Sequence, residues 1–350
     1  MIQRKLTKKV RVGQIYVGGD APIAVQSMLN TDTRDVEASL RQIRALRTAG
    51  CDIVRLAVPD MAAADALAEI TKGVDMPMVA DIHFDYRLAL RAIEHGVAKL
   101  RINPGNIGSR DRVEAVAKAC QDKGIPIRIG VNSGSLEKDL LEKYGGPVPE
   151  ALVESALRHV AILDEVNFND VIISIKSSNV MRTVEAYRLL SKQTDLPLHI
   201  GVTEAGTTWR GTIKSAVGIG TLLAEGIGDT LRVSLTGDPL EEIKVGREIL
   251  KSVGYLKEGI EFVSCPTCGR TEIDLIGIAT EVEKRLEGLN KPIKVAVMGC
   301  AVNGPGEAKD ADIGIAGGKG VGIIFKKGVI VRRVGEAELV DALMAEIESM

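Results

Sequence analysis

Three of the five cysteines have the spacing of a metal centre. Cys265 and Cys268 form a Cys-x-x-Cys motif, and Cys300 follows 32 residues later in a segment rich in glycine. No histidine lies beyond residue 199, and the nearest acid after Cys300 is Glu307. Three thiolates with one non-cysteine ligand fit a [4Fe-4S] cluster with one distinct iron. A zinc site and a metal-free dithiol are the alternatives that this spacing leaves open.

Five positively charged side chains stand near the ends of short apolar segments: Arg55, Arg101, Arg128, Lys176 and Arg232. If these segments are parallel strands, their carboxyl ends meet at one edge. Polar residues on the same strand faces would join the cations there, namely Asn103, Asn132, Ser174 and Ser234. Unpaired buried charges are costly, and arginine matches phosphate oxygens, so we expect a polyanionic ligand. The alternative is that each cation pairs with an acid on the outer face.

Three further residues are candidates for proton transfer. Asp81 and His83 end one apolar segment, and Glu204 follows another in the segment Val-Thr-Glu-Ala-Gly. A carboxylate beside a bound phosphate is electrostatically unfavourable, so its presence suggests a general acid or base. A packing role for His83 and a helix N-terminal role for Glu204 are the alternatives.

Residues 22 to 236 alternate apolar runs with amphipathic helical patterns. Eight such units favour a closed (β/α)8 TIM barrel over an open sheet. No Gly-x-Gly-x-x-Gly motif follows the first run, which argues against a dinucleotide-binding sheet. A hairpin is expected over residues 10–17. The eight expected strands are Ile23–Ser27, Asp52–Val58, Met78–His83, Ala98–Asn103, Pro126–Asn132, Val171–Lys176, Leu198–Glu204 and Thr230–Leu235.

The sequence changes character after residue 258. Five short strands and two helices are expected there, which indicates a compact α+β domain. We therefore predict two domains, a substrate-binding barrel over residues 1–258 and a cluster domain over residues 259–350. The expected strands are Glu261–Val263, Ile293–Met298, Ile313–Ala316, Gly320–Phe325 and Val329–Arg332, and the expected helices are Ile276–Leu286 and Glu336–Ile347.

Composition narrows the classes of function. The 350 residues include 45 Lys and Arg against 47 Asp and Glu, a net charge of −2. We therefore expect no nucleic-acid or anionic-membrane partner, because the protein has no general basic field. No segment is apolar enough for a transmembrane helix or a secretory signal, so the expected location is the cytoplasm.

Eight motifs together resemble one enzyme family, the bacterial 4-hydroxy-3-methylbut-2-en-1-yl diphosphate synthases of the non-mevalonate isoprenoid pathway. The resemblance covers essentially the whole chain and has no departure at the residues used below. The motifs are QSM at 26–28, RLAVPD at 55–60, ADIHF at 80–84, RINPGN at 101–106, IRIGVNSGSL at 127–136, VTEAG at 202–206, SCPTCGR at 264–270 and MGCAVNGPGE at 298–307.

This resemblance implies a reaction and a set of roles. The substrate would be 2-C-methyl-D-erythritol 2,4-cyclodiphosphate, reduced by two electrons to an open-chain allylic diphosphate with loss of water. Cys265, Cys268, Cys300 and Glu307 would hold a [4Fe-4S] cluster. The diphosphate would be bound by Arg55, Arg101, Arg128, Asn132, Lys176 and Ser234. Arg232 is a further candidate from its place in the strand pattern, not from the resemblance. Glu204 matches the family's acid or base, and Asp81 and His83 match residues at the same place.

The resemblance also implies partners. The electron donor would be a flavodoxin or a ferredoxin, and a homodimer would place the cluster domain of one chain over the barrel of the other. Because the barrel has no redox group, we expect the domains to approach by motion about the linker Gly254–Gly259.

Two alternative functions do not account for all of these residues. A pterin-binding type of barrel would not explain three cysteines in a separate domain. A non-enzymatic electron carrier or zinc-stapled interaction module would not explain five converging cations.

Overall fold

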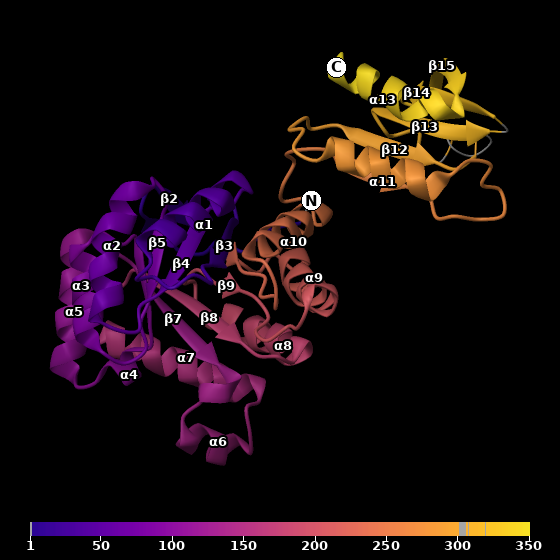
Figure 1. Cartoon of the computed structure of the whole chain (residues 1–350). Helices are drawn as coiled ribbons and strands as arrows, with labels where there is room; N and C mark the ends of the chain where they lie inside the picture. Colours follow the sequence, from indigo (N-terminus) through magenta and orange to yellow (C-terminus); the bar gives the residue numbers. More distant parts are fainter. Residues whose placement is uncertain (1, 301–305, 307, 319) are drawn as a thin grey trace. The chain divides into compact units, whose positions relative to one another are not determined.

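The protein divides into two compact units, Met1–Tyr255 and Leu256–Met350. The computed structural model describes residues 2–300, 306, 308–318 and 320–350 (Figure 1). The division lies three residues before the boundary that we expected from the sequence. Each unit has its own sheet and its own hydrophobic core.

Eight parallel strands form a TIM barrel in the first unit, which confirms the expected fold class. Their order around the sheet is β8-β7-β6-β5-β4-β3-β10-β9, and a parallel bridge between Ile173 and Leu198 closes it. The strands are β3 (Ala24–Met28), β4 (Ile53–Ala57), β5 (Met78–Asp81), β6 (Lys99–Ile102), β7 (Ile127–Asn132), β8 (Val171–Lys176), β9 (His199–Ile200) and β10 (Thr230–Leu231).

Helices follow the strands and surround the barrel (Figure 1). Aspartate side chains begin several of them, because a carboxylate accepts backbone N–H groups that lack a partner in the first turn. Asp35, Asp60, Asp85 and Asp238 act in this way. The helices are α1 (Val36–Thr48), α2 (Met61–Gly73), α3 (Tyr86–Glu94), α4 (Pro104–Ile107), α5 (Arg110–Lys123), α6 (Lys138–Tyr144), α7 (Pro149–Asp164), α8 (Val180–Ser191), α9 (Thr208–Ala224) and α10 (Pro239–Ser252).

The expected hairpin closes the amino-terminal end of the barrel. Strands β1 (Val10–Val12) and β2 (Ile15–Val17) pair antiparallel. Their buried valines pack against residues near the starts of four barrel strands, Ala24, Ile53, Val79 and Ile172. These side chains, which we call the apolar plug, close the barrel interior at this end. Ligands of this fold bind at the opposite end.

Two of the expected strands are much shorter than the sequence indicated. The pattern predicted Leu198–Glu204 and Thr230–Leu235, whereas β9 and β10 contain two residues each. Glu204 has a φ of 52°, which turns the chain out of an extended path. Leu235 donates its backbone N–H to the Glu242 side chain instead of a strand. The pattern of apolar residues does not predict that either strand ends early.

The described residues of the second unit form a five-stranded mixed sheet, and the helices over 275–286 and 339–348 pack on one face of it. The order is β11-β12-β13-β14-β15, parallel over the first three strands and antiparallel thereafter. The elements are β11 (Glu261–Ser264), α11 (Leu275–Leu286), β12 (Lys294–Met298), β13 (Ile313–Gly318), β14 (Val321–Lys326), β15 (Val329–Gly335) and α13 (Leu339–Glu348). Both helices contribute to a single core with β12, β13 and β14.

None of the helices among the described residues combines the length and the apolar character that crossing a membrane requires.

Candidate functional site

A cavity of about 190 Å³ opens at the carboxyl end of the barrel, and we call it the mouth. It collects side chains from strands that are far apart in sequence, and all five cations expected from the sequence line it. Its lining residues are Arg55, Asp81, His83, Arg101, Arg128, Asn132, Ser174, Lys176, Thr203, Arg232 and Ser234. The cations therefore do not pair off individually on the outer surface of the barrel.

Asp81 is a buried carboxylate between two of these cations. One carboxylate oxygen lies 3.3 Å from Arg101 Nη1, and the other lies 3.7 Å from Arg55 Nε and 3.8 Å from His83 Nε2. Burial opposes its charge, but Arg55, His83 and Arg101 outweigh that effect and hold the pKa of Asp81 well below its ordinary value. Asp81 is therefore ionised at neutral pH and suited to orient its neighbours.

A second carboxylate reaches the mouth from a helix. Glu242 on α10 lies 3.4 Å from Arg232 Nη2 and accepts hydrogen bonds from Ser27 Oγ at 2.8 Å and from Leu235 N at 3.0 Å. Its side chain is only 4% exposed. Glu242 thus holds Arg232 and the chain after β10 in place, a role that its position in a helical pattern does not reveal.

Arg128 and Lys176 have no carboxylate partner among the described residues. Arg128 donates to Ser174 Oγ at 2.7 Å, while its Nε and Nη2 are buried without a hydrogen-bond acceptor there. Burial, reinforced by Arg55 for Arg128 and by Arg232 for Lys176, lowers the pKa of both side chains well below their ordinary values. Buried donors without a carboxylate partner favour the binding of an anion, which would supply the missing acceptors.

Two glycines make the space for these cations. A Cβ on Gly130 would lie 2.5 Å from Arg101 Nε, and one on Gly201 would lie 3.1 Å from Lys176 Nζ. The carbonyl oxygen of Gly130 also accepts from Arg101 Nη2 at 2.8 Å and from the Asn103 side chain at 3.1 Å. Asn103 thus supports the mouth from within the barrel wall and is not itself part of its lining.

The charges of the mouth do not balance. Five basic side chains line it, whereas only two carboxylates lie near them in the described part: Asp81 in the lining and Glu242 behind Arg232. Burial lowers the pKa of Arg55 only to about 10, so that guanidinium stays charged at neutral pH. The arrangement favours a ligand with at least two negative charges, since such a ligand supplies acceptors and charge together.

The proton-transfer candidates are placed differently. Asp81 and His83 line the mouth, whereas Glu204 is exposed and is not part of the lining. Glu204 sits in the turn directly after Thr203, which does line it. Two residues at the site were not expected from the sequence: Glu242, and Met28, whose sulfur lies 2.7 Å from Arg55 Nη2. Only their proximity in the folded chain identifies them.

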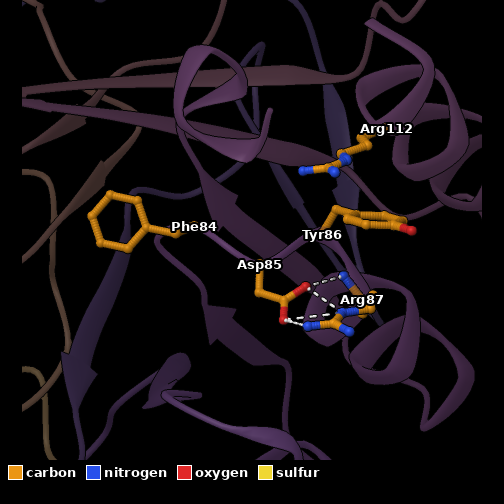
Figure 2. A pocket seen from close by; sticks show the side chains of 5 residues that line it. All are labelled: Phe84, Asp85, Tyr86, Arg87 and Arg112. Carbon is orange, nitrogen blue, oxygen red and sulfur yellow. Dashed lines mark hydrogen bonds and ion pairs between the residues drawn. The ribbon is translucent and has the colours of Figure 1, made fainter. Parts of the chain in front are cut away.

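A second cavity, of about 410 Å³, is lined by the four residues after His83 in the chain and by Arg112. Figure 2 shows Asp85 turned toward Arg87 while Phe84 extends away from Tyr86 and Arg112. Asp85 begins α3 and lies 2.7 Å from Arg87 Nη2, and the Arg112 guanidinium lies 5.3 Å from the Tyr86 ring centre. The Asp85 carboxylate is therefore occupied, and Asp81 is the acid of this segment that faces the mouth.

The cysteines lie at the carboxyl ends of neighbouring parallel strands in the second unit. Cys265 follows β11, Cys300 follows β12, and the N–H of Gly299 donates to Cys265 Sγ at 3.1 Å. Cys268 is exposed, and hydrogen bonds from Arg270 lower the pKa of its thiol. The predicted fourth ligand, Glu307, lies outside the described residues, and in the described part no three His, Cys, Asp or Glu side chains form a metal site.

The fold and the mouth define a two-domain protein in which a TIM barrel with a cationic mouth is joined to an α+β domain with three cysteines. The GcpE TIM-barrel domain matches residues 7–247, and the GcpE protein C-terminal domain matches residues 261–349. The chain therefore belongs to the GcpE family, as its two matches together cover nearly its whole length.

Curated relatives support this membership. A protein of Clostridium acetobutylicum is 70% identical over 349 residues, and one of Clostridium perfringens is 68% identical, each covering 100% of both chains. Both are named 4-hydroxy-3-methylbut-2-en-1-yl diphosphate synthase (flavodoxin). Among solved structures, a dihydropteroate synthase of Coxiella burnetii has a TM-score of 0.49 at 12% identity, covering 71% of this chain and 98% of that one.

Proposed function

We propose that this chain catalyses the reaction for which its relatives are named. It reduces 2-C-methyl-D-erythritol 2,4-cyclodiphosphate by two electrons to (E)-4-hydroxy-3-methylbut-2-enyl diphosphate, with ring opening and loss of water. The reaction supplies isoprenoid precursors, and we place it in the cytoplasm. The observation that carries the proposal is the excess of cations at the mouth of a barrel whose family is shown by full-length relatives.

The diphosphate occupies the mouth in this proposal. Its oxygens accept hydrogen bonds from Arg128, which has two buried donors without an acceptor in the described part, and from the buried Lys176 beside it. Arg55, Arg101 and Arg232 add charge from the sides, each already oriented by Asp81 or Glu242. Asn132 and Ser234 provide neutral donors at the same rim.

Three residues handle protons and orientation. The oxygen that leaves as water must be protonated, and we assign that role to Glu204, whose exposed position in the turn after Thr203 leaves it free to face a bound substrate. Asp81 remains a carboxylate and orients Arg55 and His83. His83, which is 58% exposed, is placed to donate a proton or a hydrogen bond to the substrate.

The second domain fits an iron–sulfur group, and we propose a [4Fe-4S] cluster held by Cys265, Cys268, Cys300 and Glu307. Ends of adjacent strands bring two of the cysteines together, and the Gly299 N–H bond to Cys265 Sγ is of the kind that tunes such clusters. When bound, the group would supply electrons to the substrate. The barrel residues would bind, orient and protonate that substrate. We propose a flavodoxin or ferredoxin as the electron donor.

The proposal divides the work between domains. Residues 1–258 bind the cyclodiphosphate and residues 259–350 carry the cluster. Turnover requires both, so we propose motion about Gly254–Gly259 and a homodimer in which the cluster domain covers the partner's barrel. No nucleic-acid partner is proposed, because the net charge is −2 and the chain has no general basic field.

Anaerobic purification tests the proposal directly. We expect about four irons and four sulfides per chain, together with an EPR signal of the dithionite-reduced protein that changes when the cyclodiphosphate is added. One zinc per chain without sulfide would reduce the second domain to a structural unit. The reductase proposal would then be wrong, and the cationic mouth would require another reaction.

A further inference from the structure

A lysine that the proposed mechanism does not use lies inside the barrel. Lys99 begins β6 and is 0% exposed, although the mouth lining does not include it. Its ammonium group donates to Gln26 Oε1 at 3.2 Å. Gln26 belongs to β3, and β4 and β5 separate that strand from β6 in the sheet. The Lys99 side chain therefore extends across the interior between the apolar plug and the mouth.

The groups around Lys99 are neutral or positive. Arg55 on β4 and Arg128 on β7 both act on it electrostatically. His199 on β9 is buried, contacts Thr230 Oγ1 on β10 at 2.7 Å, and is influenced by Lys99 and by Lys176 on β8.

The acid of the neighbouring strand does not offset these charges. Asp81 on β5 is engaged with Arg55, His83 and with Arg101, which lies on the same strand as Lys99. In the described part of the chain, no ion pair or hydrogen bond joins a carboxylate to Lys99.

An ammonium group in this position is unfavourable. It has three donors and one neutral acceptor, and its side chain has no exposed surface. A buried lysine without an anionic partner avoids this cost by releasing its proton. Burial, with Arg128 and Arg55, indeed lowers the pKa of Lys99 well below its ordinary value.

We propose that Lys99 is a proton-binding site coupled to the mouth: it is uncharged in the free protein and takes up one proton when a diphosphate binds above it. The inference rests on the proposed function, since it requires the mouth to hold the diphosphate. The anion reverses the sign of the local field, because its negative charge faces the same Arg55 and Arg128 that act on Lys99. The protonated lysine then adds a positive charge beneath the ligand.

Coupling of this kind makes affinity depend on pH in a defined direction. If binding takes up one proton, the dissociation constant should rise about tenfold for each pH unit over which uptake is complete. Replacement of Lys99 by methionine removes the proton site while preserving length and most of the volume. That variant should bind with less pH dependence than the wild type, and more weakly than the wild type at low pH.

Isothermal titration calorimetry measures the proton directly. The oxidised full-length protein, with its bound cofactor, is titrated anaerobically with the cyclodiphosphate at one pH in Hepes, Tricine and Tris. This ligand is a cyclic diester and has no group that titrates near neutral pH. The slope of binding enthalpy against buffer ionisation enthalpy should be about one proton larger for the wild type than for Lys99→Met. Any proton taken up by Lys176, whose pKa burial also lowers, is common to both proteins and cancels in this difference.

The controls separate Lys99 from its neighbours. His199→Gln should keep the proton uptake, because His199 is not the proposed site. Lys99→Met should melt no lower than the wild type, since it removes a buried polar group. If it does not fold, Lys99→Gln provides the same test with a side chain that can pair with Gln26.

Each possible result of these titrations supports or overturns the inference. An unchanged slope in Lys99→Met, or a wild-type slope near zero, would overturn the inference while leaving the diphosphate site intact. Loss of the slope in His199→Gln alone would move the proton to the histidine and overturn it as well. Wild-type protein that binds no cyclodiphosphate would instead contradict the proposed function.

Discussion

Replacing Glu242 by glutamine should weaken the fold and strengthen anion binding at the same time. Glu242 is 4% exposed and joins Arg232, Ser27 and Leu235 at 3.4, 2.8 and 3.0 Å. A glutamine has the same shape, and its amide oxygen can still accept from Leu235 N and Arg232. The substitution therefore removes mainly the negative charge.

The size of both effects follows from that charge. Hydrogen bonds to charged groups are worth about 1.5–3 kcal/mol, so we expect the free energy of unfolding to fall by about 2 kcal/mol. For a domain of this size that corresponds to a decrease in Tm of about 4–8 °C. Removal of one negative charge from the wall of the mouth should tighten cyclodiphosphate binding about three- to tenfold.

The assay is scanning calorimetry together with anaerobic titration of the oxidised protein with the cyclodiphosphate. Glu241→Gln is the matched control, because it makes the same change one residue earlier in α10 at a site that is 40% exposed. It should alter neither quantity appreciably. If Glu242→Gln lowered Tm but left affinity unchanged or weakened it, the charge argument would be refuted, and Glu242 would act on ligand binding by positioning Arg232.

Three further predictions concern other parts of the site. Asp81→Asn leaves Arg55 and Arg101 without their carboxylate and should lower the free energy of unfolding by about 3 kcal/mol at pH 7. The pKa of Asp81 in the folded protein is depressed from 3.8. The difference between variant and wild type in the urea midpoint should therefore hold above pH 5 and shrink as the pH falls below about 4. Gly130→Ala places a Cβ 2.5 Å from Arg101 Nε and should raise KM for the cyclodiphosphate about tenfold, with little effect on iron content. Cys265→Ser should lose most of its iron and sulfide, measured by chemical analysis, while Cys120→Ala should keep both, because Cys120 is buried in α5 of the barrel.

A control variant or a contradicting result accompanies each of these three predictions. Gly134→Ala adds the same methyl group where nothing lies within 4 Å, so a similar rise in KM there would contradict the steric argument for Gly130. A constant difference between Asp81→Asn and wild type down to pH 2 would contradict the charge assigned to Asp81. Full iron content in Cys265→Ser would exclude that residue as a ligand.

Much of the barrel was predictable from the sequence because periodicity reports burial. Eight apolar runs separated by amphipathic segments specify parallel strands covered by helices, and the structure has eight such strands. The hairpin over residues 10–17 followed from its alternation and pairs as expected. Arg55, Arg101 and Arg128 lie within three of the predicted strands, and the closed parallel barrel brings these strands side by side.

Other features depended on contacts that no local pattern carries. The expected extents of β9 and β10 were wrong, because the paths after Ile200 and Leu231 are set by the turn at Glu204 and by the bond from Leu235 to Glu242. In the sequence, Glu242 reads as an acid in the first turn of a helix. Its role depends on how α10 packs against β3 and the chain after β10.

The sequence by itself determined the barrel, the five cations, the Cys-x-x-Cys motif and the family resemblance, because each is written in residue types at short or regular spacing. The tertiary structure alone decided which charges are paired. Asp81 is shared among neighbouring cations, Arg232 is held by Glu242, and Arg128 keeps buried donors without an acceptor in the described part. It also enclosed Lys99 between the plug and the mouth. The physical reason is that electrostatic energy depends on distance and burial in three dimensions, which spacing along the chain does not encode.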